Sequence, residues 1–421
     1  MIVSTSTGAA DPRLLAACGI VTAADEASKD SQQKSKTHVA VKASDLSALA
    51  RTDAPDGLAP LSLPFVIVDE ACQSVEPATL IPVTASNSCR SLVMLGDPCQ
   101  LPPTVRSADA TPLSVSLMER LAMTLPVPSV SSPVDSTLKD TSFLDTLAVK
   151  QAMSSVRSRE RGERQQSSYR KRFAGSLLLS IQYRMHPSIA AFPSAIFYDG
   201  LLSTPSFMSD QRSFPRVLNS MMPCGNPSIC VRMIDVGGRG NERRGMPSRF
   251  TRTVFGSVAP SALEEQTSYW NEPEAQRVVA LIKDILTDDD PEVKTIGIIT
   301  PYNAQVQLIK GMIASDRDLQ EMLGRLPATI EVKSVDGYQG RERDLIIFSA
   351  VRSNRQGTIG FLHDWRRMNV ALTRAKNGLV VLGDLTTLSE ADKHWDALTK
   401  WAAGVRCIVD DWDSPEDEPS I

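Results

Sequence analysis

The sequence of 421 residues is poor in the residues that build metal centres and membrane spans. It contains four histidines and seven cysteines, and no two cysteines form a Cys-x-x-Cys pair. We therefore predict no zinc site and a reducing, intracellular location, in the cytoplasm or the nucleus. No apolar run approaches about 18 residues, so we expect no transmembrane helix and no membrane partner. The first residues also lack the basic leader and apolar core of a secretory signal.

A large excess of charge of either sign is missing as well. The formal net charge is −4, so the whole chain has no basic field of the kind that many nucleic-acid-binding domains have. A local basic groove does not require a basic total, and nucleic acid therefore remains a possible partner. Hydrophobic residues make up 42% and charged residues 22%, as in soluble globular proteins, and the length suggests two or three domains.

The most informative segment that is present is the apolar run Phe65–Val68, followed by Asp69 and Glu70. Such a run predicts a strand buried on both faces, with the acids at its carboxyl end, where open α/β sheets bind ligands. In a phosphate-handling ATPase the first acid holds Mg²⁺, usually through water, and the second polarises the attacking water. The alternative is an ordinary strand capped by solvated acids.

A second apolar run, Ser91–Leu95, ends in a turn that contains Asp97 and Gln100. Its distance from the first run suits a strand, a crossover and a parallel strand. Two such strands would bring Asp69, Glu70 and Gln100 to one edge of a sheet. The amide of Gln100 can donate to a phosphate oxygen and accept from water, although the segment can also be a simple turn.

The segment Gln182–Pro187 adds a planar guanidinium, Arg184, and an aromatic ring, Tyr183. Arg184 suits phosphate oxygens, and the ring can stack on a base. His186 precedes a proline, so we interpret it as the start of a helix and not as a catalytic base.

The C-terminal half alternates strands and helices. The pattern predicts a strand over Thr295–Thr300, a helix from Asn303, a buried strand over Asp344–Val351 and a final strand over Leu379–Leu382. Before the third of these elements, Gly337 and Gly340 allow the backbone to approach a ligand closely, and Glu342 can accept from a ribose hydroxyl. In the helically spaced segment Asn369–Lys376, Arg374 is either an arginine finger or a solvated arginine on a helix surface.

Five of these segments together resemble the ordered motifs of superfamily 1B helicases, most closely the up-frameshift and senataxin-like branch. They are Val68–Gln73, Leu95–Leu101, Gln182–Pro187, Ser334–Glu342 and Asn369–Ala375. In that family two RecA-like domains clamp ATP and move 5′ to 3′ along single-stranded RNA or DNA. The resemblance implies an ATP-dependent helicase or translocase that uses ATP and Mg²⁺ and has possible protein cofactors.

The resemblance also implies roles for individual residues. Asp69 would bind Mg²⁺, Glu70 would orient the attacking water, and Gln100, Arg184 and Arg374 would contact the terminal phosphate. The nucleotide would further contact Gln182, Tyr183, Gly340 and Glu342, with Tyr183 on the adenine and Glu342 on the ribose. The nucleic-acid backbone would contact Pro301, Tyr302, Asn303 and Ser334.

One family motif is missing. The family begins with a P-loop, whose backbone N–H groups and lysine cradle phosphates, but the sequence contains no Gly-Lys-Ser or Gly-Lys-Thr. Lys34–Thr37 lacks the glycines, and Ser4–Leu14 resembles the segment that follows the P-loop. We therefore expect the chain to begin partway through the first motor domain. A second function thus stays open, a catalytically inactive module that binds nucleic acid or protein through the second motor domain.

The expected fold class is α/β, with tandem RecA-like domains of the P-loop NTPase type, parallel sheets and an incomplete first domain. We expect the first domain over residues 1–125, a Ser-rich and basic insertion, partly disordered, over 126–176, and the second domain over 177–408. The second domain is expected to contain a long insertion over about 205–269. Residues 409–421 form an acidic tail.

Overall fold

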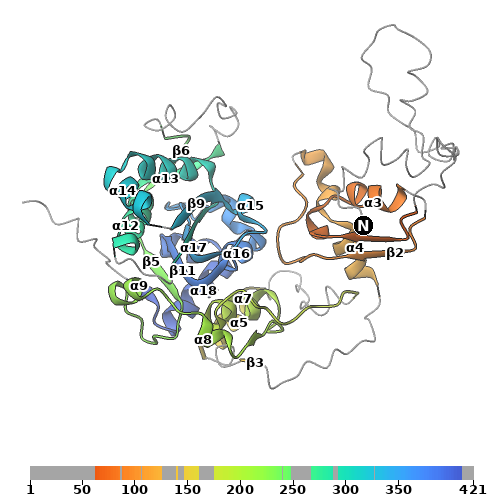
Figure 1. Ribbon diagram of the computed structural model, residues 1–421, viewed down its shortest axis with the longest axis horizontal. Helices are drawn as coiled ribbons and strands as arrows, with labels where there is room; N and C mark the ends of the chain where they lie inside the picture. Colours follow the sequence, from red (N-terminus) through yellow and green to blue (C-terminus); the bar gives the residue numbers. More distant parts are fainter. Residues whose placement is uncertain are drawn as a thin grey trace, which may run out of the picture. The chain divides into compact units, whose positions relative to one another are not determined.

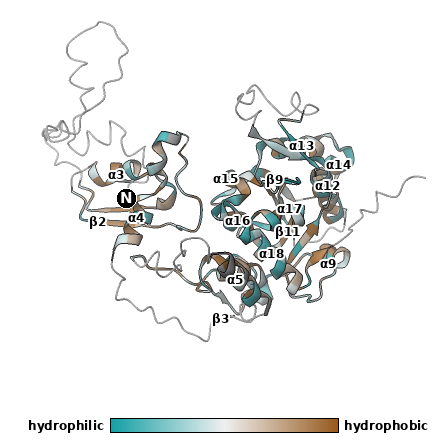
Figure 2. Ribbon diagram, turned by 180° about the vertical axis from the view of Figure 1, so that it is seen from behind, coloured by the Kyte–Doolittle hydropathy of each residue, from teal (hydrophilic) through white to brown (hydrophobic). Residues whose placement is uncertain are grey.

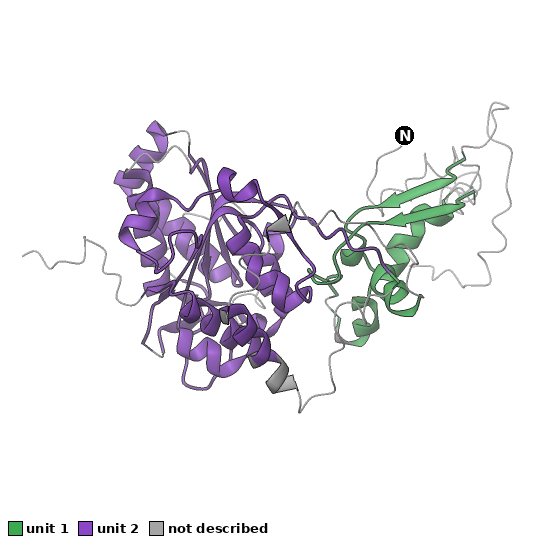
Figure 3. Ribbon diagram, turned by 90° about the horizontal axis from the view of Figure 1, so that it is seen from below, with its two compact units in different colours: residues 1–127, 173–175 green, residues 128–172, 176–421 purple. Residues whose placement is uncertain are grey.

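The computed structural model describes residues 62–85, 88–105, 107–125, 139–140, 147–160, 175–238, 240–247, 267–287, 293–326 and 328–409. The chain divides into two compact units, residues 1–127 with 173–175 and residues 128–172 with 176–421 (Figure 3). Ser4–Leu14, Lys34–Thr37, the acidic tail from residue 410 and most of the expected insertion over 126–176 lie outside the described residues.

The first unit is built on two parallel strands, β1 (Phe65–Val68) and β2 (Ser91–Met94), which pair from Phe65 opposite Ser91 to Val68 opposite Met94. The helices in the described part of this unit are η3 (Ala71–Gln73), α3 (Glu76–Thr84), η4 (Ala108–Ser114) and α4 (Leu117–Thr124). Val83 of α3 and Met118 of α4 pack on Val66 and Val68 to form a small core. The predicted strand, crossover and parallel strand are thereby confirmed.

Burial of β1 on both faces was predicted wrongly. The side chains of Phe65 and Ile67 are 72% and 68% exposed, and Val93 of the neighbouring strand is 46% exposed. The described helices pack their apolar side chains on the opposite face, with Val66 and Val68, so burial alternates along the strand. Figure 2 shows the apolar residues of β2 in brown. An apolar run alone therefore did not reveal how many faces of this strand are covered.

The second unit is organised by a parallel sheet of six strands in the order β12-β5-β11-β10-β8-β9. Its strands are β5 (Val231–Asp235), β8 (Thr295–Thr300), β9 (Thr329–Ser334), β10 (Arg343–Ser349), β11 (Ala375–Gly383) and β12 (Ile408–Val409). The central strands β8, β10 and β11 are nearly continuous apolar runs and are buried, as expected for a parallel sheet covered on both faces. The predicted α/β class with parallel sheets is confirmed.

Helices surround this sheet (Figure 1). They are α5 (Leu147–Glu160), α7 (Pro187–Phe197), α8 (Met208–Gln211), α9 (Arg216–Met221), α12 (Glu272–Thr287), α13 (Asn303–Ser315), α14 (Arg317–Arg325), α15 (Val335–Tyr338), η6 (Gly360–His363), α16 (Trp365–Leu372), α17 (Leu385–Ala391) and α18 (Lys393–Gly404). In one group α12, α13 and α14 pack against one another, and in another α5, α7 and α18 do. The described part of the unit also contains two short antiparallel pairs, β3 (Lys139–Asp140) with β4 (Thr204–Pro205) and β6 (Glu242–Arg244) with β7 (Tyr269–Asn271). Among the described residues no helix is long and apolar enough to cross a membrane.

The predicted insertion over about 205–269 is wrong in its first half, because β5 lies inside the sheet between β12 and β11. A charged residue, Arg232, interrupts the apolar pattern of this strand and concealed it in the sequence. The Arg232 side chain is fully buried, and its guanidinium donates to the carbonyls of Met222 and Ile229, each at 2.7 Å. It also lies 4.3 Å from the centre of the Phe214 ring. Contacts with other segments thus stabilise a buried charge at a position where the sequence pattern would not predict a strand.

The expected insertion over 126–176 also contains part of the folded second unit. Helix α5 spans Leu147–Glu160 and packs on α18 and α7. Its buried residues Ala148, Val149, Ala152 and Val156 have helical spacing and form one apolar face. Within the expected insertion, Leu147–Glu160 is therefore a helix that packs on the helices of the second unit.

Gly297 in β8 lets the connection from β9 to β10 cross closely over the sheet. A Cβ atom at this position would lie 2.6 Å from Cδ1 of Ile346 and still closer to the hydroxyl of Tyr338. Tyr338 belongs to α15, which follows β9, and its side chain is fully buried. The absence of a side chain at Gly297 therefore leaves room for Tyr338, and this allows the segment that carries Ser334 and Gly340 to pack closely on β8.

We expect Gly297→Ala to lower the free energy of unfolding by about 1–3 kcal/mol, because overpacking forces the buried Tyr338 to move. Gly324→Ala is the matched control, since nothing lies within 4 Å of a Cβ atom there and the residue is in helix α14. The control should be neutral or more stable by up to about 1 kcal/mol. Denaturant unfolding of both variants measures this, and equal stabilities would contradict the close contact.

Candidate functional site

In the first unit, Asp69 and Glu70 form the turn that follows β1, and both side chains are exposed. Glu70 has a left-handed backbone with φ 51°, which is uncommon for a residue other than glycine. The Glu70 N–H donates to Oδ1 of Asp69 at 2.9 Å, and Nε2 of Gln73 donates to Oε2 of Glu70 at 2.6 Å. The turn thus presents two carboxylates to solvent in a fixed arrangement.

Gln100 lies in the corresponding turn after β2. Its Nε2 donates to Oδ2 of Asp97 at 2.8 Å. The Ala71 N–H donates to the carbonyl of Leu95 at 2.8 Å and ties the two turns together. Gly96 allows this approach, since a Cβ atom there would lie 3.0 Å from the Cys72 nitrogen. Asp69, Glu70 and Gln100 therefore share the carboxyl edge of two adjacent strands, as their spacing predicts.

In the second unit, Glu342 joins two motifs that lie far apart in the sequence. One carboxylate oxygen accepts from Nε of Arg184 at 2.7 Å, and the other pairs with Nζ of Lys376 at 2.9 Å. Nη1 of Arg184 also donates to the carbonyl of Thr373 at 3.0 Å. Glu342 and Lys376 lie at the starts of the neighbouring strands β10 and β11. This cluster therefore forms at the amino edge of the sheet.

The cations determine the protonation of Glu342. Desolvation raises the pKa of its carboxyl group, but the hydrogen bonds from Lys376 and Arg184 and their charges outweigh this and lower the pKa to about 2. The carboxylate is therefore ionised at neutral pH. As arranged, Glu342 is a partner of two cations, whereas the resemblance assigned it to a ribose hydroxyl, and that assignment remains a prediction.

Gln182 and His186 organise the turn that carries Arg184. Oε1 of Gln182 accepts from the N–H groups of Arg184 and Met185 at 2.9 and 2.8 Å, and its Nε2 donates to Thr204 Oγ1 at 2.6 Å. His186 is the N-cap of α7, and its Nδ1 accepts from the Ser188 N–H, which confirms the predicted helix start. The amide of Gln182 thus has a local structural role in addition to the predicted contact with nucleotide.

Tyr183 differs from its neighbours in this turn, because its side chain is 62% exposed. The exposed ring is free to stack on a base, and the prediction that it contacts the adenine stays a prediction. The ring contributes little to the packing of the turn.

Arg374 is not a solvated arginine on a helix surface. It follows the end of α16, and its side chain is only 2% exposed. Its Nε donates to the carbonyl of Val370 at 3.0 Å, and its carbonyl accepts from the Arg343 N–H at 3.1 Å. Arg374 thus lies at the same amino edge as Glu342, and its role as an arginine finger remains a prediction.

The residues predicted to contact nucleic acid lie at the other edge of this sheet. Pro301, Tyr302 and Asn303 follow β8, and Ser334 ends β9, the neighbouring strand. Ser334 caps α15, since its hydroxyl accepts from the Gly337 N–H at 3.3 Å. Tyr302 is only 2% exposed, so its side chain packs inside the unit and leaves Asn303 as the exposed member of the turn.

The structure thus divides the predicted residues of the second unit between two edges of the sheet. Gly340 belongs to the connection between these edges, and its φ of 72° suits glycine. The sequence analysis gave Lys376 no role in the site. Its position at the start of the strand after Arg374 was a signal that could have suggested one. Gly96 was read only as part of a turn, because its close contact with Cys72 is long-range.

Comparisons with known proteins find similar sequences over most of this chain. Two family models, each described as an AAA domain, match residues 162–386 and residues 25–108. Helicase sen1 of Schizosaccharomyces pombe is 31% identical over 346 residues, which are 80% of this chain and 15% of that protein. The regulator of nonsense transcripts 1 homolog of Arabidopsis thaliana is 31% identical over 347 residues, 82% of this chain and 21% of that protein. The probable helicase senataxin of Homo sapiens is 34% identical over 354 residues, 82% of this chain and 10% of that protein.

The matched segment is a small part of each relative. The chain spans 21% or less of the length of these three proteins. The names of these relatives describe the whole proteins and not this segment alone.

We expect Glu342→Gln to remove a stabilising contribution that depends on pH. The pKa of Glu342 is lowered from 4.5 to about 2 in the folded chain, so the contribution is fully present above pH 4.5 and is lost as the pH falls toward 2. Its size is limited by solvent, because the Glu342 side chain is 42% exposed. The free energy of unfolding should therefore fall more steeply between pH 4.5 and 2 in the unaltered chain than in the variant.

Glu321→Gln serves as the control for the loss of one carboxylate, because Glu321 is an exposed residue of α14. Its profile should follow that of the unaltered chain. Parallel profiles for Glu342→Gln and the unaltered chain would contradict the cluster.

Proposed function

Because the chain belongs to the superfamily 1 helicases of the up-frameshift and senataxin-like family, we propose that it is an ATP-dependent motor acting on single-stranded RNA or DNA. Movement from 5′ to 3′ is part of the proposal, by likeness to that family. The observation that carries it most directly is the ion pair between Arg184 and Glu342, which joins two family motifs across 158 positions of sequence. If these two motifs only ended strands, no ion pair between them would be needed.

The carboxylates of the first unit suit the activation of water. Mg²⁺ supplies charge neutralisation for phosphates, and it is usually bound in proteins by one or two carboxylates, several waters and substrate oxygens. Asp69 fits that pattern, because its side chain is exposed at the carboxyl end of β1. Glu70 would accept a hydrogen bond from the attacking water and orient it. The amide of Gln100 would contact the terminal phosphate.

The cations of the second unit suit the stabilisation of phosphate charge. Arg184 and Lys376 flank Glu342 at the amino edge of the sheet, and Arg374 lies at the same edge. The guanidinium groups of Arg184 and Arg374 are suited to the oxygens of anionic phosphates and to the charge that develops during hydrolysis. Arg374 is already fixed by its hydrogen bond to Val370, so little ordering would be needed.

A second function is favoured by the sequence itself. It contains no Gly-Lys-Ser or Gly-Lys-Thr, the lysine-containing turn that cradles phosphates in this class of enzyme. A chain that binds no ATP would still have the carboxyl edge of the second sheet, with Asn303 and Ser334. We therefore propose, as the alternative, a module that binds nucleic acid or protein without hydrolysis.

Hydrolysis of ATP and strand binding by the 421-residue chain separate the two functions. For the motor, we expect saturable hydrolysis that rises when a single-stranded oligonucleotide is added. Glu70→Gln should lower turnover by about 100-fold or more and leave ATP binding intact, because it removes the group that orients water.

The outcomes are distinct. Strand binding without ATP affinity would support the binding module and contradict the motor. Hydrolysis that does not respond to Glu70→Gln would contradict the assigned mechanism. A chain that binds neither ATP nor a single strand would overturn the motor and leave only protein binding for the module.

A further inference from the structure

The loop that follows β10, residues 350–358, has an unusual backbone conformation at its start. Val351 has φ 74°, and its side chain is fully buried. A branched residue in this region is strained by about 1–3 kcal/mol, and such strain persists only where surrounding contacts hold it. We call this segment the β10 loop. It lies at the carboxyl edge of the sheet, where parallel sheets bind ligands.

A buried carboxyl group holds the start of the β10 loop. Both oxygens of Glu274 accept from the Val351 N–H, at 3.0 and 2.8 Å, and one accepts from Oγ of Ser349 at 2.6 Å. Asn271 Nδ2 donates to the Val351 carbonyl at 3.0 Å. Desolvation raises the pKa of Glu274 to about 8, so keeping this group in the core is unfavourable. A simple connection between a strand and a helix would not need a buried carboxyl group.

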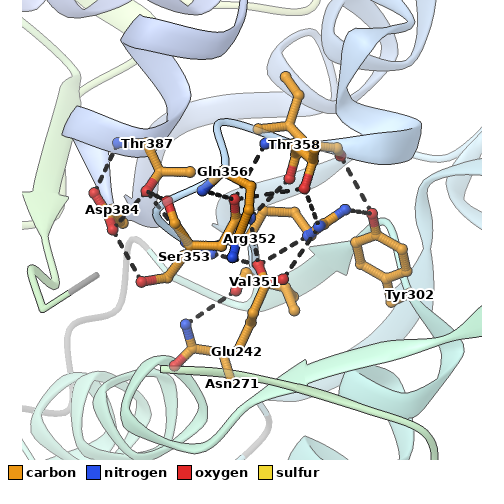
Figure 4. Close-up of polar contacts among 12 residues, drawn as sticks. Glu242, Asn271, Tyr302, Val351, Arg352, Ser353, Gln356, Thr358, Asp384 and Thr387 are labelled. Atoms are coloured by element: carbon orange, nitrogen blue, oxygen red, sulfur yellow. Dashed lines mark hydrogen bonds and ion pairs between the residues drawn. The ribbon is translucent and has the colours of Figure 1, made fainter. Parts of the chain in front are cut away.

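A second carboxylate, Glu242 of β6, clamps the middle of the β10 loop (Figure 4). It accepts from Nε and Nη2 of Arg352 at 2.9 and 3.1 Å, which is a bidentate pair. It also accepts from the Ser353 N–H at 2.8 Å and from Nδ2 of Asn354 at 2.9 Å. One side chain from outside the helicase motifs therefore satisfies three successive residues of the loop.

The far end of the β10 loop is closed by its own residues and by β11. Oδ1 of Asn354 accepts from the N–H groups of Gln356 and Thr358, each at 3.1 Å. Ser353 Oγ donates to Oδ2 of Asp384, the residue after β11, at 2.9 Å. The loop is thus fixed at its start, middle and end, as the close-up shows (Figure 4).

The same network reaches the turn that the sequence assigned to nucleic acid. Nη1 of Arg352 donates to the Tyr302 hydroxyl at 3.2 Å, and that hydroxyl donates to the Ile359 carbonyl at 3.3 Å. The buried Tyr302 therefore links the turn Pro301–Asn303 to the β10 loop. The hydrogen bonds of Tyr302 therefore fix the turn and the β10 loop relative to each other.

The side chains of the β10 loop fall into two sets. Arg352, Ser353 and Asn354 are buried and take part in the network, whereas Arg355 and Gln356 are exposed. Arg355 has no side-chain partner among the residues that the structure describes. A rigid loop thus presents an unpaired guanidinium at the ligand-binding edge of the sheet, and a guanidinium suits the oxygens of a phosphodiester.

We propose that the β10 loop contacts the phosphate backbone of a single strand through Arg355, and that Glu242 is the positioning residue of this contact. The inference rests on the proposed binding of nucleic acid and adds a contact and its support. The partner is a phosphodiester, so RNA and DNA strands should respond alike.

The first test is Arg355→Ala in the 421-residue chain, measured by fluorescence anisotropy with labelled 20-nucleotide oligouridine and oligothymidine. Loss of one phosphate contact should weaken binding by about fivefold at 0.1 M salt and lower the slope of log affinity against log salt by about 0.7. Arg317→Ala is the matched control. Arg317 is exposed and follows α13, which begins at the carboxyl end of β8 and extends about 20 Å away from it.

The second test compares the direction of the change in binding with the direction that a change of charge alone would cause. Glu242→Gln removes a negative charge, so electrostatics alone would strengthen the binding of a strand. A positioning role predicts the opposite, weaker binding by about twofold to fivefold, with a smaller additional effect of Arg355→Ala in the double variant. Glu321→Gln, a change of the same charge on α14, should leave binding unchanged or slightly stronger.

These outcomes decide between the inference and its premise. Normal affinity and salt slope in Arg355→Ala, with strand binding by the unaltered chain, would overturn the inference alone. No strand binding by the unaltered chain would overturn the proposed nucleic-acid function and the inference with it. Stronger binding by Glu242→Gln would refute its positioning role. If that variant fails to fold, Arg355→Ala still decides the contact, because an exposed residue is not needed for packing.

Discussion

Acidic side chains hold the ends of the parallel strands in the second unit, and the geometry of both edges depends on them. At the amino edge, Glu342 binds Arg184 and Lys376 and thereby joins motifs that are distant in sequence. At the carboxyl edge, Glu274 and Glu242 fix the backbone and side chains of the β10 loop. A buried or half-buried carboxyl group is unfavourable unless several hydrogen-bond partners satisfy it, so each one forces its neighbours into a defined arrangement.

This division gives the two edges different chemistry. At the amino edge, Arg184, Arg374 and Lys376 supply cations of the kind that suit the phosphates of a nucleotide. The carboxyl edge offers hydrogen-bonding groups on short turns and the exposed guanidinium of Arg355, and suits a polymer backbone. The strands β8 and β10 run from one edge to the other.

Local signals in the sequence predicted much of this fold. The strand Thr295–Thr300, the helix from Asn303 and the helix start at His186 are confirmed, because periodicity and capping depend on neighbouring residues. Features that depend on distant contacts were not predictable. The strand around Arg232 was missed because carbonyls from other segments satisfy its charge, and the burial of Tyr302 depends on the β10 loop. The residue types of the candidate site were readable from the sequence, whereas the atoms that meet, such as Nε of Arg184 and Oε2 of Glu342, were not.

The central claim is that a nucleic-acid strand binds at the carboxyl edge of the second sheet and a nucleotide at the amino edge. Photo-crosslinking of the 421-residue chain to an oligonucleotide containing 4-thiouridine, followed by mass spectrometry of the peptides, tests it most directly. The claim predicts crosslinks at residues 301–303, near Ser334 and within residues 350–358. Crosslinks concentrated around Arg184, Glu342 and Arg374, with none at the carboxyl edge, would contradict it.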